Sequence, residues 1–193
     1  VIADKVFVSF EESREFFPRA KTLLTGLPVR RGFEPHEMPD PARFCLLVCG
    51  GSQGARALNM AMADALPLLG AAADRLQVLH QAGSADCDML RQRYAEFGVR
   101  AEVEAFVHDM ASWYRRAHVV LCRAGASTFA ELALCGKASV LVPYPFAAGN
   151  HQERNAQVFA REGACELLPQ ERLSGTTLAA LLRRLMDNPE LCA

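Results

Sequence analysis

Residues 44–60 read FCLLVCGGSQGARALNM and are the most informative segment of the chain. The segment opens with a short apolar run that favours a buried strand, and it closes with a helix-forming run that begins at Ala55. Between the two runs, Gly50, Gly51 and Gly54 fall within five positions, which is more glycine than a tight turn needs. The pattern therefore predicts a strand, a glycine-rich turn and a helix, which is the repeating unit of a parallel α/β sheet.

The same alternation continues towards the end of the chain. Short, largely apolar runs predict strands buried on both faces, at 44–49, 76–80, 101–107, 118–122, 139–144 and 165–168. Helical patterns lie between and after them, at 54–70, 86–97, 109–116, 127–135, 151–162 and 174–187. Six such repeats predict an α/β fold with a Rossmann-like, doubly wound parallel sheet.

The residues before this unit do not fit it. Residues 1–29 offer two strands and a short helix, too few elements to bury a core of their own. They are interpreted as the remnant of another α/β domain, and the chain, which opens on valine, as a piece of something longer. The segment 30–43, RRGFEPHEMPDPAR, contains three prolines and is expected to link that remnant to a domain over 44–193.

Composition restricts the function classes. Of the 193 residues, 51% are hydrophobic and 22% are charged, as in a well-cored globular protein. A formal net charge of −1 gives no electrostatic reason to expect nucleic acid or an anionic membrane as the main partner. The 7 cysteines lack the spacing of zinc ligands and are expected to be reduced, buried thiols of a cytoplasmic protein. Neither a signal peptide nor an apolar run of roughly 20 residues, as a membrane span requires, is visible.

In an open parallel sheet, ligands bind at the carboxyl ends of the strands, so the loops there are examined first. The glycines of GGSQGA let a ligand approach the backbone, and the N-terminus of the helix that follows favours an anion. Ser52 adds a hydroxyl donor for a phosphate oxygen. The spacing matches neither the dinucleotide fingerprint nor a Walker A loop, and a tight turn with close helix–sheet packing is the alternative.

The fourth strand leads into CRAGASTFAEL, residues 122–132. Ala126, Ser127 and Thr128 can form a second phosphate cradle, and the Glu131 carboxylate suits a pair of ribose hydroxyls. The alternative is an ordinary capping box of Thr128 and Glu131, and spacing alone leaves the two interpretations even.

The fifth strand leads into PYPFAAGNHQERNAQVF, residues 143–159. This loop delivers His151, Gln152 and Asn155 at the start of a helix, and amide side chains suit the hydroxyls of a neutral sugar. The alternative is that Asn150 caps the helix and the remaining polar residues are solvated. Convergence of three such loops on one sheet edge favours a binding site.

These motifs together resemble the MurG family of bacterial glycosyltransferases. The resemblance rests on TGLPVR, LLVCGGSQGARALN, FVHDM and VLCRAGASTFAELALCGKASVLVPYPFAAGNHQERNA, and it runs from about residue 3 to residue 168. It implies a GT-B architecture, in which two Rossmann-like domains enclose a cleft and the C-terminal domain binds UDP-N-acetylglucosamine (UDP-GlcNAc). The chain resembles that C-terminal domain together with the last elements of the N-terminal one.

The resemblance assigns donor-binding roles position by position. Gly50, Gly51, Gly54 and Ser52 correspond to the diphosphate loop, and Glu131 corresponds to the ribose-binding carboxylate. The other donor-binding residues that it implies are Arg30 at the domain junction, Phe106 and Val107 at the uracil, Ala126, Ser127 and Thr128 at the phosphates, and His151, Gln152 and Asn155 around the sugar. It implies no catalytic residue in this chain, no cofactor and no obligatory metal.

The activity implied by the resemblance is an inverting transfer of GlcNAc from UDP-GlcNAc to the 4-hydroxyl of the MurNAc of lipid I, which gives lipid II in peptidoglycan synthesis. The acceptor site, the general base and the membrane contact belong to the missing N-terminal domain. The complete protein is expected to be peripheral on the cytoplasmic face of the inner membrane, and this chain is expected to be inactive alone. The alternatives are another GT-B transferase of a UDP-sugar and a nucleotide-binding module without catalysis.

Overall fold

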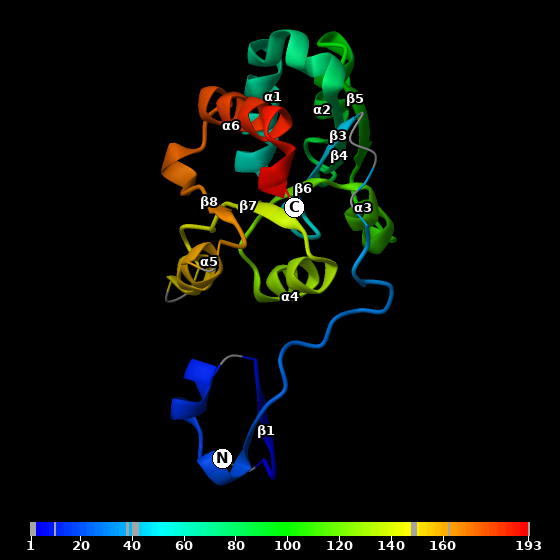
Figure 1. Cartoon of the computed structure of the whole chain (residues 1–193). Helices are drawn as coiled ribbons and strands as arrows, with labels where there is room; N and C mark the ends of the chain where they lie inside the picture. The colour runs from blue at the N-terminus through cyan, green and yellow to red at the C-terminus, as the bar shows by residue number, and fades with distance from the viewer. Residues whose placement is uncertain are drawn as a thin grey trace.

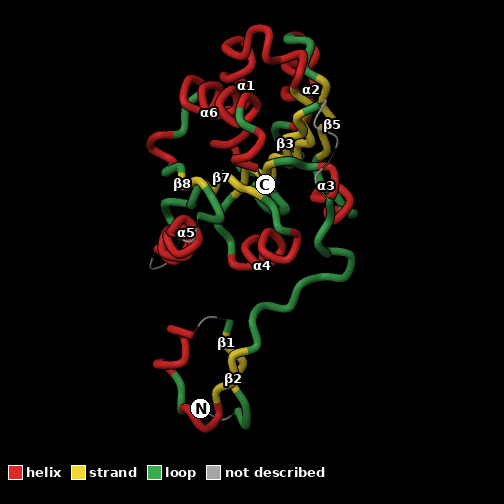
Figure 2. Tube along the Cα trace, viewed as in Figure 1, coloured by secondary structure: helices red, strands yellow, loops and turns green. Residues whose placement is uncertain are grey.

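The computed structural model of the chain describes residues 3–9, 11–37, 39, 43–147, 150–161 and 163–192. Its main body is a parallel sheet covered by helices on both faces (Figures 1 and 2), which confirms the predicted fold class. The strand order is β5-β4-β3-β6-β7-β8, and every neighbouring pair is parallel. The strands are β3 (Phe44–Cys49), β4 (Leu76–Gln81), β5 (Arg100–Glu104), β6 (Val119–Cys122), β7 (Ala138–Leu141) and β8 (Glu166–Leu167).

Alternate residues of the central strands divide the core between the two faces of the sheet. Leu46 and Val48 pack on one face, whereas Cys45, Leu47 and Cys49 pack on the other. The first face is covered by α1 (Arg56–Leu69), α2 (Cys87–Glu96) and α6 (Gly175–Asp187). The second is covered by α3 (Met110–Arg116), α4 (Ala126–Cys135) and α5 (His151–Arg161).

The order of the strands marks a place for a ligand. From β3 the chain adds β4 and β5 on one side of the sheet, and it then crosses to add β6, β7 and β8 on the other. The register pairs Cys49 with Cys122, so that β3 and β6 end side by side. The loops that follow these two strands therefore flank the topological switch point, where open α/β sheets bind their ligands.

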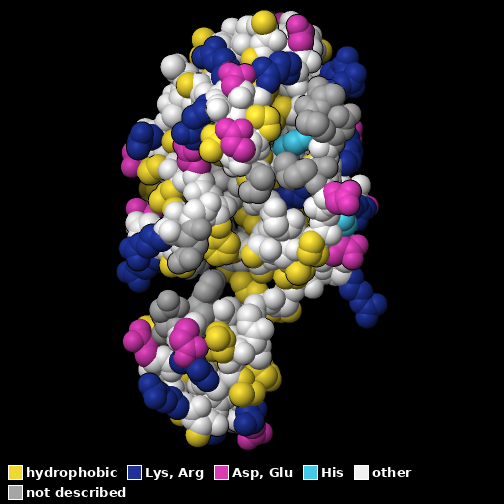
Figure 3. All heavy atoms as spheres, viewed as in Figure 1, with side chains coloured by type: hydrophobic (Ala, Val, Ile, Leu, Met, Phe, Trp, Pro, Cys, Tyr) yellow, Lys and Arg dark blue, Asp and Glu magenta, His cyan; other side chains and the backbone are white. Residues whose placement is uncertain are grey.

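The N-terminal elements form a separate, smaller unit (Figure 1). Strands β1 (Val6–Val8) and β2 (Thr22–Leu24) pair in parallel, and a 3-10 helix, Glu11–Phe16, lies between them in the chain. Apolar side chains are exposed on this unit (Figure 3), among them Phe7 at 66% and Phe16 at 73%. The boundaries expected at residues 29 and 43 stay a prediction.

Candidate functional site

The glycine-rich loop after β3 is shaped by its contacts with the protein interior. A Cβ on Gly50 would lie 2.2 Å from the Ala55 Cβ, and a Cβ on Gly54 would lie 2.0 Å from the Ala82 carbonyl oxygen. Gly51 differs, because a Cβ there would meet open space and its φ of +91° is what favours glycine. The close packing considered as an alternative therefore accounts for Gly50 and Gly54, and Gly51 and the exposed Ser52 form the accessible part of the loop.

A buried polar network fixes the base of this loop. Asn59 of α1 donates to the Ala82 carbonyl and to Asp86, both at 2.8 Å, and its side-chain oxygen lies 3.0 Å from Nε2 of His80. Nδ1 of His80 lies 2.9 Å from the Tyr94 hydroxyl, so that each polar group has a partner. Burial lowers the pKa of His80 to about 3, against the opposing effect of Asp86, and the imidazole is therefore neutral. His80 therefore has a structural role in this network.

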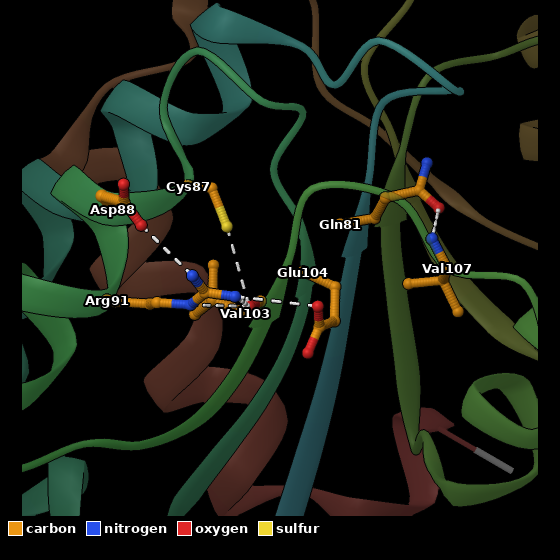
Figure 4. A network of polar contacts seen from close by, with 7 residues as sticks. All are labelled: Gln81, Cys87, Asp88, Arg91, Val103, Glu104 and Val107. Carbon is orange, nitrogen blue, oxygen red and sulfur yellow. Dashed lines mark hydrogen bonds and ion pairs between the residues drawn. The ribbon is translucent and has the colours of Figure 1, made fainter.

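Gln81, the last residue of β4, joins two loops and was not identified from the sequence. Its side-chain nitrogen donates to the Gly51 carbonyl at 2.7 Å, and its side-chain oxygen accepts from the Val107 N–H at 3.1 Å, the contact drawn in Figure 4. The predicted diphosphate loop and the predicted uracil loop are thus tied to one amide. Phe106, beside Val107, is 47% exposed and stacks edge-on against His108.

The capping-box interpretation of the loop after β6 is wrong. Helix α4 starts at Ala126 with Gly125 as its N-cap, and no side chain caps it, so Ser127 and Thr128 lie in its first turn. Helices α1 and α2 also begin without a side-chain cap, whereas α3 and α6 are capped by Asp109 and Ser174. The uncapped N-termini of α1 and α4 flank the switch point and leave backbone donors for an anion.

Glu131 points from α4 to the segment that precedes the domain. Its Oε1 accepts from Arg30 at 2.9 Å, and the Tyr114 hydroxyl lies 3.5 Å from its Oε2. The Arg30 guanidinium lies 5.3 Å from the Phe33 ring centre, and Phe33 packs edge-on against Tyr114. Burial raises the pKa of Tyr114, so its hydroxyl stays protonated. Two residues predicted separately for the donor site, Arg30 and Glu131, are therefore in contact.

The loop after β7 depends on Arg123, which the sequence analysis also missed. Arg123 donates to the carbonyls of Val142 and Pro143 at 3.2 and 3.3 Å, and to Gln170 at 2.7 Å. Gln152 accepts from the Tyr144 N–H at 2.9 Å, which leaves its side-chain N–H groups for a ligand. Asn155 is half-buried on α5, and the side chain of His151 lies outside the described residues.

The arrangement is suited to holding a phosphorylated ligand. Two uncapped helix N-termini and the Ser52 hydroxyl can neutralise a diphosphate, and the Glu131 carboxylate can accept from two neighbouring hydroxyls. Within the described residues there is no cluster of three or more metal-ligating side chains and no helix long and apolar enough to span a membrane. A cavity of about 670 Å³ lies at the opposite, amino end of the strands, where it is lined by Val119, Lys137, Ala138, Ser139, Glu166 and others, and it is not part of this site.

The fold is that of one domain of a GT-B glycosyltransferase. A crystal structure of MurG from Acinetobacter baumannii superposes with a TM-score of 0.76 at 32% identity, covering 99% of this chain and 54% of that one. Two curated relatives, from Geobacter sulfurreducens and Syntrophotalea carbinolica, are 46% and 48% identical over 97% and 95% of this chain. Both bear the name UDP-N-acetylglucosamine--N-acetylmuramyl-(pentapeptide) pyrophosphoryl-undecaprenol N-acetylglucosamine transferase.

The particular family follows from the sequence itself. Residues 45–192 match the glycosyltransferase family 28 C-terminal domain, and the chain belongs to that family. The chain spans about half the length of the curated relatives that it matches, 53% and 51% of the two named here.

Proposed function

We propose that this chain is the donor-binding half of an enzyme that transfers N-acetylglucosamine from UDP-GlcNAc to a lipid-linked N-acetylmuramyl acceptor. The names of the relatives support this activity, and their similarity extends over nearly the whole chain. The observation that carries the proposal is the pair of uncapped helix N-termini, those of α1 and α4, on either side of the switch point. Such a pair is suited to a sugar diphosphate.

Each predicted residue has a role in this proposal. Ser52, Ser127 and Thr128 donate to the diphosphate together with the backbone of the glycine loop and of Ala126, and Glu131 accepts from the ribose hydroxyls. Gln152 and Asn155, with His151, contact the sugar, and Arg30 approaches it from the preceding segment. The base packs beside Phe106 and Val107. Because Gln81 already accepts from the Val107 N–H, the base can bind that group only as a second acceptor.

The chemistry that this chain contributes is stabilisation of the leaving group. In an inverting transfer the 4-hydroxyl of the acceptor attacks the anomeric carbon, the bond to UDP breaks, and the hydroxyl proton passes to a base. Helix dipoles and hydroxyl donors aimed at the departing diphosphate lower the barrier most where its charge develops. We assign the base and the acceptor site to the remainder of the longer protein, so this chain alone is expected to be inactive.

The partners follow from the same assignment. UDP-GlcNAc contacts this chain, and the lipid-linked acceptor contacts the remainder of the protein. We assign membrane contact at the cytoplasmic face to the complete protein and not to the domain over residues 44–193. No role in nucleic-acid binding is proposed.

Calorimetric titration of the chain tests the donor assignment. UDP-GlcNAc is titrated beside UDP, UDP-galactose and NAD, and selective binding of UDP-GlcNAc and UDP is expected. Tighter binding of UDP-galactose than of UDP-GlcNAc would point to a different transferase of the same fold. An absence of binding to every uridine nucleotide by a folded sample would overturn the proposal.

Two substitutions test whether the nucleotide binds at Ser52 and Glu131. Ser52→Ala and Glu131→Ala are each expected to weaken UDP binding about tenfold, because each removes a hydrogen bond to a charged or hydroxyl-rich group. Thr176→Ala and Glu171→Ala remove an exposed hydroxyl and an exposed carboxylate away from these two positions, and they serve as controls. Equal affinities in all four variants would place the nucleotide elsewhere.

A further inference from the structure

Gln81 is an amide buried between two loops that lie on either side of β4. Its relative exposure is 3%, and its two hydrogen bonds run to the Gly51 carbonyl and to the Val107 N–H. Strand β4 pairs with β3 on one side and with β5 on the other, and Gln81 is opposite Cys49 and Glu104 in the register. The side chain therefore reaches from the end of β4 to the loops after β3 and β5, and Figure 4 shows its contact with Val107.

The two bonds orient the backbone groups that a nucleotide would meet. In a planar trans peptide the carbonyl and the N–H point in opposite directions. When Gln81 holds the Gly51 carbonyl, the Ser52 N–H of the same peptide is turned away from Gln81. When Gln81 holds the Val107 N–H, the Phe106 carbonyl is likewise turned away. One side chain thus aims a donor on the diphosphate loop and an acceptor on the uracil loop.

Close backbone packing holds the glycine loop against the end of β4 as well. A Cβ on Gly54 would lie 2.0 Å from the Ala82 carbonyl oxygen, and a Cβ on Gly83 would lie 2.1 Å from the Gln53 carbonyl oxygen. These contacts fix the distance between the loop and the strand. They do not reach the Val107 loop, so within the described part of the chain Gln81 supplies the direct bridge between the two loops.

We propose that Gln81 is a positioning residue that holds the diphosphate loop and the uracil loop in one fixed relation, so that both parts of a nucleotide diphosphate are bound together. This inference rests on the proposed function. Gln81 touches neither part of the ligand itself and acts through Gly51 and Val107. An apolar side chain of the same size would fill the space, but it would leave the buried Val107 N–H without its acceptor, and it would remove one donor from the Gly51 carbonyl, which also accepts from the Gly54 N–H at 2.9 Å.

Two variants distinguish the contributions of the two Gln81 hydrogen bonds. Gln81→Leu removes both hydrogen bonds, and Gln81→Glu keeps an acceptor for the Val107 N–H while an ionised carboxylate repels the Gly51 carbonyl. We expect Gln81→Leu to weaken UDP binding about tenfold and Gln81→Glu to weaken UDP binding about tenfold but uridine binding less than about twofold. Gln77→Leu makes the same change four residues earlier on β4, and it is expected to leave both affinities unchanged.

The pH profile of Gln81→Glu is a readout that simple loss of packing would not change. A protonated carboxyl can donate to the Gly51 carbonyl again, so UDP affinity in this variant is expected to recover as the pH falls towards the pKa of the new carboxyl. The wild type and Gln81→Leu should show no such recovery. A flat profile for Gln81→Glu, or UDP binding by Gln81→Leu within about twofold of the wild type, would overturn the inference.

Amide hydrogen exchange in the ligand-free chain keeps this test separate from that of the function. Gln81→Leu is expected to speed exchange at Val107 and at residues 51–54, whereas Gln77→Leu is not. If the wild type binds no uridine nucleotide, the proposed function fails and the exchange result alone decides whether Gln81 bridges the loops. Unchanged exchange in Gln81→Leu would contradict the bridge whatever the ligand.

Discussion

The two halves of the sheet's carboxyl edge are built differently. In the β3–β5 half, the loops over 50–55, 82–86 and 105–109 are joined by Gln81, by two close glycine contacts and by the network around Asn59. In the β6–β8 half, the loop over 142–147 is held mainly by Arg123 and Gln152.

The difference is also visible in what each half exposes. Asn59 and His80 are 1% and 0% exposed, whereas Tyr144 and Phe146 are 43% and 80% exposed. A fully satisfied buried network gives a fixed geometry, and a loop held by a few side chains adapts more readily. Under the proposed function, the rigid half suits the nucleotide, and the adaptable half suits the sugar that is transferred.

The largest effect is expected from breaking the β3–β5 half at Gly54. Gly54→Ala places a methyl group against the Ala82 carbonyl at a φ of +74°, and we expect it to lower the free energy of unfolding by about 3 kcal/mol or more. Gly51→Ala meets open space and should cost only the strain of its positive φ, about 1–2 kcal/mol. Chemical denaturation measures both. Equal costs would show that close packing does not define this loop.

The second-largest effect is expected from acid, which should lower the free energy of unfolding through His80 in the same half. The neutral form of His80 is stabilised in the fold, with a pKa of about 3, and in the unfolded chain the pKa of this imidazole is near the ordinary histidine value of 6.5. Because the unfolded state binds the additional proton, stability is full above pH 6.5 and is lost as the pH falls towards 3. The loss between about pH 7 and about pH 5 should be about 2 kcal/mol.

A variant pair attributes this pH dependence to one residue. His80→Gln should remove most of the slope, although it will also lower stability at neutral pH, whereas His108→Gln changes an exposed imidazole and should keep the slope. Urea denaturation across the pH range measures the slope of the free energy of unfolding against pH in each variant. A slope that survives in His80→Gln would assign the effect to other groups.

The β6–β8 half is tested at Arg123. Arg123→Leu removes the donors to Val142, Pro143 and Gln170, so the loop after β7 loses its anchor. We expect the affinity for UDP-GlcNAc to fall about tenfold while the affinity for UDP changes less than about twofold, as calorimetry can measure. Arg100→Leu, at the amino end of β5, is the control. A proportional loss of UDP binding would mean that the two halves are not independent.

The smallest effect is expected at Tyr114. Tyr114→Phe removes one hydrogen bond of 3.5 Å to Glu131 and keeps the ring against Phe33. A contact of that length is weak, and UDP affinity should change less than about threefold. A larger change would show that Tyr114 orients Glu131 more strongly than the distance implies.

Much of the fold could be predicted because each element carries its own local signal. The six predicted strands and six predicted helices of the main domain are all present, with ends that differ by a few residues. Two expected strands end three residues early, 101–107 at Glu104 and 139–144 at Leu141. The first ends there because the chain turns and the Val107 N–H donates to the Gln81 side chain. Apolar character alone could not reveal that turn.

The site was predictable only where its chemistry lies in consecutive residues. Ser52 and the α4 residues belong to loops that the pattern marks, whereas Gln81 and Arg123 act on loops distant in sequence. The capping box failed because α4 begins at Ala126, two residues before Thr128, with Gly125 as its N-cap.

The ion pair between Arg30 and Glu131 couples ligand binding at Glu131 to the placement of residues 3–30. Arg30 precedes the domain in the chain and Glu131 lies inside it, so a ligand that takes the Glu131 oxygens must share them with Arg30 or displace it. Any displacement alters how residues 3–30 are held, and any rearrangement of those residues alters the affinity at Glu131. Thermodynamic reciprocity makes the two effects equal in free energy. Ligand affinity and the placement of the preceding segment are therefore two measurements of one coupling.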